Sequence, residues 1–266
     1  MSAESVKSAY GSGSGARPTV VVPHARPDLG REGVGVVKVS TWDVGTPERQ
    51  RAVLAAIETA WTRHGWPEAG LLSYTVHVGD DGRTLLHYSQ WADEGSYERF
   101  FAEVRSGRNA EIDTAVPGIE RLGLHVYELY REGRGDAGDP RVPGSVVIVE
   151  IEFDGPDPDR QRAWVDGVFA AMAADPLFDG DGTEPERGRR PQDAGIGGWF
   201  HLGTDGTRVL NYAEWETAEA HAAALEGPGG GVGSDTEEWR RVHDYPGIRE
   251  SRVRRYTPGL SLRPGA

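Results

Sequence analysis

The chain has 266 residues, a formal net charge of -13 at pH 7 and no cysteine. The lack of cysteine excludes disulfide bonds, thiolate metal sites and a cysteine nucleophile. The acidic charge argues against nucleic acid or an anionic membrane as a partner, and no apolar run reaches the roughly 18 residues of a membrane span. We therefore expect a cytoplasmic protein without a nucleic-acid or membrane partner.

The chain begins with residues rich in Ser, Gly, Pro and Arg, which predict a flexible leader over residues 1–30. Thr19–Val22 is compatible with an edge strand or an arm, because prolines flank it. A first folded unit follows over residues 31–131. Its expected elements are a strand at 34–42, a helix capped by Thr46, strands at 71–78 and 84–91, a short helix from Asp93, a polar loop at 105–118 and a strand at 122–130.

The same order of elements restarts after a Gly- and Asp-rich linker at residues 132–144. The segment Val209–Trp215 is a second copy of Leu85–Trp91, and each copy follows a glycine-containing hairpin turn. The second unit therefore spans residues 145–258 and leaves a short tail at 259–266. Two Gly-rich insertions in this unit predict mobile surface loops, or alternatively lids over a pocket: residues 175–194 and 227–233.

Each unit has the β-α-β-β-α-β order of a ferredoxin-like fold, which places both helices on one face of a four-stranded sheet. The other face is apolar here, so two copies in one chain can cover each other. We expect an α+β fold of two tandem ferredoxin-like units packed sheet to sheet as an intramolecular dimeric α+β barrel. This internal pseudo-dimer would occur as a monomer or as a homodimer of tandem chains. A carboxylate buried between the sheets needs a partner such as Arg or Tyr across the barrel. The residues expected between the sheets include Leu86, Tyr88, Gln90, Leu210, Tyr212 and Glu214.

Side-chain alternation groups several polar and aromatic residues on the opposite, helix-covered face. If the hairpin turn pairs His77 with Leu85, His77 joins His87 and Trp91 on that face. A register shifted by one residue would separate them. Core packing of the tryptophans and a structural role for the histidines are the alternatives, and no third ligand suggests a metal site. The same register groups, in the second unit, His201, Asn211 and Trp215.

Three features resemble the antibiotic biosynthesis monooxygenase family of dimeric α+β barrels: His77 before the turn, a strand ending in Trp91, and Tyr97 on the next helix. The second unit resembles the family more closely still, through Asn211–Trp215. The resemblance implies an oxidoreductase of secondary metabolism. It would be a cofactor-independent monooxygenase that oxidises an anthrone or phenol of polyketide type, with O₂ as co-substrate. The catalytic residues it implies are His77, His87, Trp91, Tyr97, His201, Asn211 and Trp215.

Neither unit carries the full family set, because the first has His87 at the Asn position and the second has His221 in place of Tyr97. One unit can therefore be catalytic and the other a scaffold, and the Asn–Trp pair favours the second. A polyketide cyclase or isomerase, and a non-catalytic binding or structural protein, are the alternatives. Heme degradation needs an axial histidine where the chain has Phe101 and Leu225. We expect no metal and no cofactor, and a small aromatic substrate as partner.

Overall fold

The computed structural model describes residues 17–68, 70–134, 139–178, 190–227, 229 and 231–266. They form an α+β fold with a large antiparallel sheet. The first half of the chain contains β1 (Thr19–Pro23), β2 (Val36–Asp43), α1 (Pro47–His64), β3 (Leu71–Gly79), β4 (Thr84–Trp91), α2 (Glu94–Glu103), α3 (Arg105–Ala115) and β5 (Glu120–Arg134). The second half contains β6 (Ser145–Phe153), α4 (Pro158–Ala174), η1 (Pro191–Ala194), β7 (Gly195–Gly203), β8 (Arg208–Trp215), α5 (Ala218–Leu225), α6 (Glu237–His243) and β9 (Ile248–Pro264).

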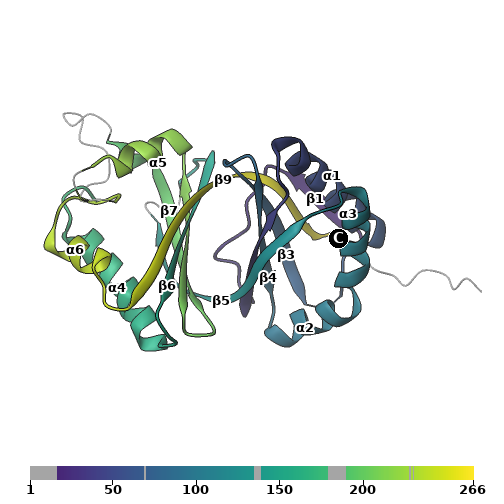
Figure 1. Ribbon diagram of the computed structural model, residues 1–266, viewed down its shortest axis with the longest axis horizontal. Helices are drawn as coiled ribbons and strands as arrows, with labels where there is room; N and C mark the ends of the chain where they lie inside the picture. The colour runs from purple at the N-terminus through teal and green to yellow at the C-terminus, as the bar shows by residue number, and fades with distance from the viewer. Residues whose placement is uncertain (1–16, 69, 135–138, 179–189, 228, 230) are drawn as a thin grey trace, which may run out of the picture.

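The sheet closes on itself. Its strand order is β1-β9-β3-β4-β2-β5-β7-β8-β6, and β9 also pairs with β6. Two long strands join the halves: β5 pairs first with β2 and then with β7, while β9 pairs first with β6 and then with β3. Helices α1, α2 and α3 flank one side of the closed sheet, and α4, α5 and α6 flank the other (Figure 1). None of the described helices is long and apolar enough to cross a membrane.

The first helix of each half is fixed over the hairpin that follows it. Thr46 caps α1 and Asp157 caps α4, each by accepting a hydrogen bond from a backbone N–H of the first turn. The amide of Gln50 donates to the carbonyls of Gly79 and Thr84, on either side of the β3–β4 turn. Gln161 does the same across the β7–β8 turn. These buried amides fix the position of each helix on its sheet. They therefore also fix the space between the helix and the sheet.

The interior of the closed sheet is aromatic and joins the halves through two histidines. The hydroxyl of Tyr88 lies 3.1 Å from Nε2 of His201, and the hydroxyl of Tyr212 lies 3.2 Å from Nε2 of His77. The two tyrosine rings meet edge to face at 5.5 Å. The apolar residues expected on this shared face do pack there, in one interior cluster that includes Leu86, Tyr88, Leu210 and Tyr212.

The segment after residue 16 belongs to the fold, which corrects the expectation of a flexible leader up to residue 30. β1 pairs with the end of β9, and Leu29 is buried in the interior cluster. The guanidinium of Arg26 forms an ion pair with Glu214, whose side chain is 0% exposed. The expected arginine partner of this carboxylate is therefore present, but it comes from the N-terminal segment. Residues 1–16 lie outside the described part.

The expected tail and insertions also contain ordered residues. Gly259 to Pro264 continue β9, so a tail from residue 259 is wrong. Within the expected loop at 175–194, Asp175 accepts hydrogen bonds from the Ser234 backbone and hydroxyl and from the Trp239 indole. Residues 179–189, 228 and 230 lie outside the described part, so the loop and lid alternatives there stay predictions.

Four buried histidines make the stability of this fold sensitive to acid. Burial lowers the pKa of His77 and His87 to about 3 and that of His201 and His221 to about 4. The unfolded chain binds a proton at each near pH 6.5, so their contribution to stability is complete above that pH and is lost as the pH falls towards 3. Together they lower the free energy of unfolding by about 5 kcal/mol per pH unit between pH 6 and 4.5.

We therefore expect acid unfolding at roughly pH 4–5, because a domain has about 5–15 kcal/mol in total. Chemical denaturation at a series of pH values measures the slope. His201→Gln should reduce it by about a quarter. A wild-type stability that is flat between pH 6.5 and 4.5 would contradict the burial of these imidazoles.

Candidate functional site

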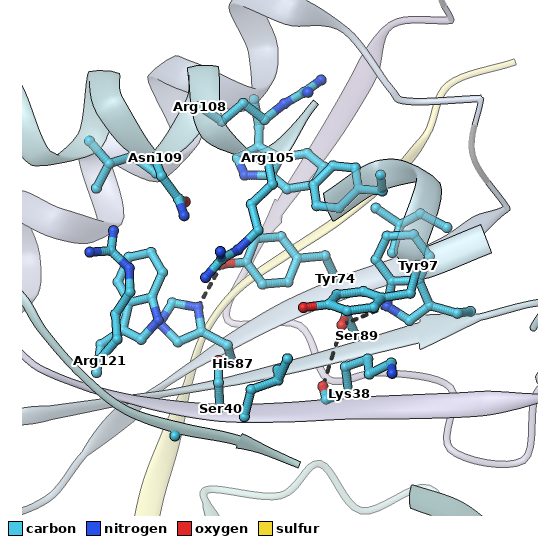
Figure 2. Close-up of a pocket in the computed structure, with 18 residues that line it drawn as sticks. Lys38, Ser40, Tyr74, His87, Ser89, Tyr97, Arg105, Arg108, Asn109 and Arg121 are labelled. Carbon is cyan, nitrogen blue, oxygen red and sulfur yellow. Dashed lines mark hydrogen bonds between the residues drawn. The ribbon is translucent and has the colours of Figure 1, made fainter. Parts of the chain in front are cut away.

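A cavity of about 160 Å³ lies between the sheet and helices α2 and α3 of the first half (Figure 2). Strands β2, β3, β4 and β5 supply its floor. Alternation along β4 points His87, Ser89 and Trp91 towards the helices, and β2 adds Lys38 and Ser40 beside them through the pairs Lys38–Ser89 and Ser40–His87. The cavity therefore lies on the helix-covered face, opposite the barrel interior.

Tyr74 and His87 form a hydrogen-bonded pair in the cavity. The Tyr74 hydroxyl lies 2.6 Å from Nδ1 of His87, and the His87 ring packs at 4.0 Å from that of Trp42. Burial, reinforced by the nearby charge of Arg121, lowers the pKa of His87 to about 3, so the imidazole is neutral at pH 7. Burial also raises the pKa of Tyr74. The phenol thus donates to Nδ1, and His87 carries its proton on Nε2, which has no hydrogen-bond partner among the described residues.

Aromatic rings form the walls. Trp91 meets Tyr97 edge to face at 5.3 Å and Phe100 at 5.2 Å, and its indole N–H donates to the Ser89 hydroxyl at 2.9 Å. Trp61 packs on Tyr74 at 4.9 Å from the other side. Flat rings on several sides favour a planar ligand. A cavity of about 150 Å³ holds one benzene ring, so a larger ring system would extend towards the exposed Leu124 at the mouth.

The lining is basic although the chain is acidic. Lys38, Arg105, Arg108 and Arg121 contribute to it, and the described lining residues include no Asp or Glu. Arg105 makes no hydrogen bond or ion pair with any described residue; it lies over the Phe101 ring at 4.7 Å. Figure 2 shows its guanidinium directed from α3 into the cavity, towards Tyr74 and His87. An uncompensated cation beside neutral hydrogen-bonding groups is suited to an anionic ligand.

In the second half, the positions that match Lys38, Ser40 and the Tyr74–His87 pair carry other side chains. Because Trp91 pairs with Val36 and Trp215 with Ser145, Val147 and Val149 correspond to Lys38 and Ser40. The remaining matches from the repeat are Gly198 for Tyr74, Asn211 for His87, Ala213 for Ser89 and His221 for Tyr97. Trp215 packs against His221 at 4.9 Å within a cluster of small apolar residues.

The structure separates the two expected clusters. His77 pairs with Leu86 and not Leu85, and His201 pairs with Leu210 and not Val209. The β3–β4 turn holds the four residues 80–83, which Asp81 ties together through the N–H groups of Arg83 and Thr84. This register turns His77 and His201 into the barrel interior. The cavity keeps His87, Trp91 and Tyr97, while Asn211 and Trp215 lie on the helix-covered face of the second half.

Sequence reasoning missed Tyr74, Arg105 and Arg121. It treated residues 105–118 as a polar loop, whereas α3 spans Arg105–Ala115. A signal was present, because Arg105, Asn109 and Ile112 recur at the spacing of one helix face.

Comparisons with known proteins show the fold. No family model and no curated protein matches the chain. Among solved structures, an anthrone oxidase-like protein matches over 93% of this chain and 98% of its own, with a TM-score of 0.61 and 17% identity. A proposed monooxygenase from Fusobacterium nucleatum matches over 89% and 98%, with a TM-score of 0.51 and 7% identity. The chain shares its fold with these proteins.

The comparisons also correct the expectation that no cofactor takes part. Matching structures include a heme-degrading enzyme from Listeria monocytogenes, at 9% identity, 84% and 98% coverage and a TM-score of 0.39. They also include a chlorite dismutase from Candidatus Nitrospira defluvii, at 11% identity, 87% and 93% coverage and a TM-score of 0.49. Because heme chemistry occurs among the matches, the resemblance does not imply a cofactor-free protein.

The first-half cavity itself does not fit heme. Its volume of about 160 Å³ encloses about one benzene ring, far less than the four-pyrrole macrocycle of heme. The imidazole of its described lining, His87, has Nδ1 bonded to Tyr74 and its ring packed on Trp42, which leaves Nε2 as its one ring nitrogen without a partner among the described residues. Within the described residues, no cluster of three or more His, Asp or Glu side chains could hold a metal ion.

Proposed function

We propose that the chain is an oxidoreductase of the monooxygenase type that oxidises a phenolic aromatic compound in the first-half cavity. The observation that carries the proposal is the aromatic slot in which Arg105 is directed at the Tyr74–His87 pair, with no acidic residue in the described lining. The shared fold with an anthrone oxidase-like protein supports it. On the same ground we propose membership in the antibiotic biosynthesis monooxygenase family.

In the proposed reaction, the phenol or enol of the substrate binds as its anion. Arg105 stabilises the negative oxygen, because a cation in a water-poor cavity favours the ionised form. Neutral His87, held by the bond from Tyr74 to its Nδ1, orients that oxygen through its Nε2–H, while Trp91 and Tyr97 hold the ring flat. The electron-rich ring carbon then reacts with O₂. For an anthrone-type substrate a CH₂ group becomes C=O: one oxygen atom enters the product, and the other leaves as water with the two hydrogens.

We further propose a division of labour between two ferredoxin-like units, one from β2 to β5 and the other from β6 to β9. The strand orders β3-β4-β2-β5 and β7-β8-β6-β9 support the two units, since each is the order of a ferredoxin-like sheet. The second unit would act as a scaffold that covers the sheet of the first and completes the barrel. This reverses the expectation that the second unit is catalytic.

Oxygen consumption tests the proposal. Protein as purified is mixed with anthrone and with hydroxylated anthrones, and O₂ uptake and quinone formation are followed together. We expect uptake above the uncatalysed rate, with one quinone formed per O₂. Product formation that does not need O₂ would favour a cyclase or isomerase, and binding without turnover would favour a non-catalytic binding protein.

Substitution of the two matched tryptophans, Trp91 and Trp215, tests which unit carries out the reaction. Trp91→Phe removes the N–H bond to Ser89 and part of the wall, and we expect kcat/KM to fall roughly tenfold, about 1.4 kcal/mol. Trp215→Phe, at the same position of the second unit, should leave it within about twofold, which amounts to a few tenths of a kcal/mol. Steady-state kinetics of both variants measures this. A loss confined to Trp215→Phe would place the reaction in the second unit.

A further inference from the structure

We propose that the substrate carries a carboxylate in addition to its phenol, held at the α3–β5 wall of the cavity by Arg121 and Asn109. The inference rests on the proposed function only in taking this cavity as the substrate site. It names a second anionic group on the substrate and the residues that recognise it.

Arg121 has N–H donors that make no hydrogen bond to a described residue. It projects from β5, its guanidinium lies over the Trp42 ring at 4.5 Å, and its side chain is 28% exposed. One terminal nitrogen donates to Asp113 at 2.9 Å, whereas Nε is buried with no hydrogen bond to a described residue. An arginine has five N–H donors in a planar fork, so most of them remain for a ligand. Stacking on Trp42 holds the fork at the edge of the cavity.

Asn109 lies one helical turn beyond Arg105 on the same face of α3. Figure 2 shows its side chain directed into the cavity, between Arg105 and Arg121. Its amide makes no hydrogen bond to any described residue. An amide N–H beside a guanidinium offers a carboxylate two donors from different elements, which fixes the position of that group.

The charges of the cavity call for more than one anion. The acids that pair with its cations are Glu94, on Lys38, and Asp113, on Arg121; both are outside the lining and are 53% and 42% exposed. A phenolate compensates Arg105, whereas Arg121, paired with Asp113 through one terminal nitrogen, keeps its other donors for a second anion in the same space. The fold does not need a cation there, because the residue paired with Ile151, the counterpart of Trp42, is the neutral Ser251. The positive wall is therefore particular to the first half.

Calorimetric titration with two ligands that differ only in charge tests the inference: 1-naphthoate and 1-naphthamide. For the wild type we expect the carboxylate to bind at least tenfold more tightly than the amide. Asn109→Asp, which is nearly isosteric, places a negative charge in the wall and should abolish this preference while leaving naphthamide affinity within about threefold, or about 0.6 kcal/mol. Arg121→Gln should likewise abolish it.

Arg51→Gln is the matched control, since it removes a charge from the exposed face of α1 and should keep the preference. Equal affinity of the two ligands for the wild type, or a preference that survives in both wall variants, would overturn the inference. Oxygen uptake with anthrone and with an anthrone carboxylic acid separates this proposal from the preceding one. Equal turnover of the two would overturn the carboxylate site and leave the oxygenase standing. Carboxylate-selective binding without any O₂ uptake would support the carboxylate site and contradict the oxygenase.

Discussion

Arg105→Gln is expected to lower kcat/KM for a phenolic substrate by about 10²–10³-fold, the usual effect of removing a preorganised group from a developing oxyanion. Arg105 is the cation that Figure 2 shows directed at Tyr74 and His87, and it has no ion-pair partner among the described residues. Its loss leaves the substrate oxygen beside the neutral Tyr74–His87 pair, without the cation directed at that pair. Steady-state O₂ uptake over a range of substrate concentrations measures the change.

The pH dependence of the same variant distinguishes this role from a structural one. Arg105 lowers the pKa of a bound phenol, because a nearby cation favours the ionised form. Without it the rising, acid limb of the rate profile should move to higher pH, and activity should partly recover as the pH is raised. Arg51→Gln, which removes an exposed arginine outside the cavity, should change neither the rate nor the profile. An unshifted profile in Arg105→Gln would show that the guanidinium does not face the ionising group.

Arg26→Met is expected to destabilise the fold by about 3 kcal/mol. Removing one partner of a buried ion pair costs roughly 3–5 kcal/mol, and the low end applies because Arg26 itself is 42% exposed. Glu214 is 0% exposed, so its carboxylate would stay inside the barrel without the guanidinium. Urea denaturation followed by tryptophan fluorescence measures the change in the free energy of unfolding.

A second substitution tests the cause of this loss. In Arg26→Met/Glu214→Gln the buried side chain no longer carries a charge, so we expect more than half of the lost stability to return. Arg51→Met, at a 70% exposed site, should stay within about 0.5 kcal/mol of the wild type. A double variant as unstable as Arg26→Met would mean that the N-terminal segment acts by packing, for example through Leu29, and not by this charge.

Much of the architecture could be read from the repeat. Val209–Trp215 copies Leu85–Trp91, and alternation along both strands correctly placed Tyr88 and Tyr212 on one interior face. The role of the N-terminal segment could not be read, because its composition is typical of a flexible arm. Tertiary contacts order this segment: β1 pairs with β9, and Arg26 forms an ion pair with Glu214.

The site could be predicted less completely from the sequence than the fold, for a geometric reason. One residue of strand register decides which face a side chain occupies, and the β3–β4 turn is one residue longer than the grouping of His77 with His87 required. The residues placed correctly, His87 and Trp91, lie on a single strand, where alternation alone decides. Arg105 could be placed only by recognising α3 as a helix, and the mostly polar sequence of α3 is also typical of a loop.

The most direct test is a crystal structure of the protein with 1-naphthol, a phenolic ring suited to the slot. The ligand is expected in the first-half cavity, with its ring beside Trp91 and Tyr97 and its oxygen within hydrogen-bonding distance of Tyr74 or Arg105. A ligand seated beside Asn211 and Trp215 in the second half, with the first-half cavity free of it, would contradict the assignment of the site.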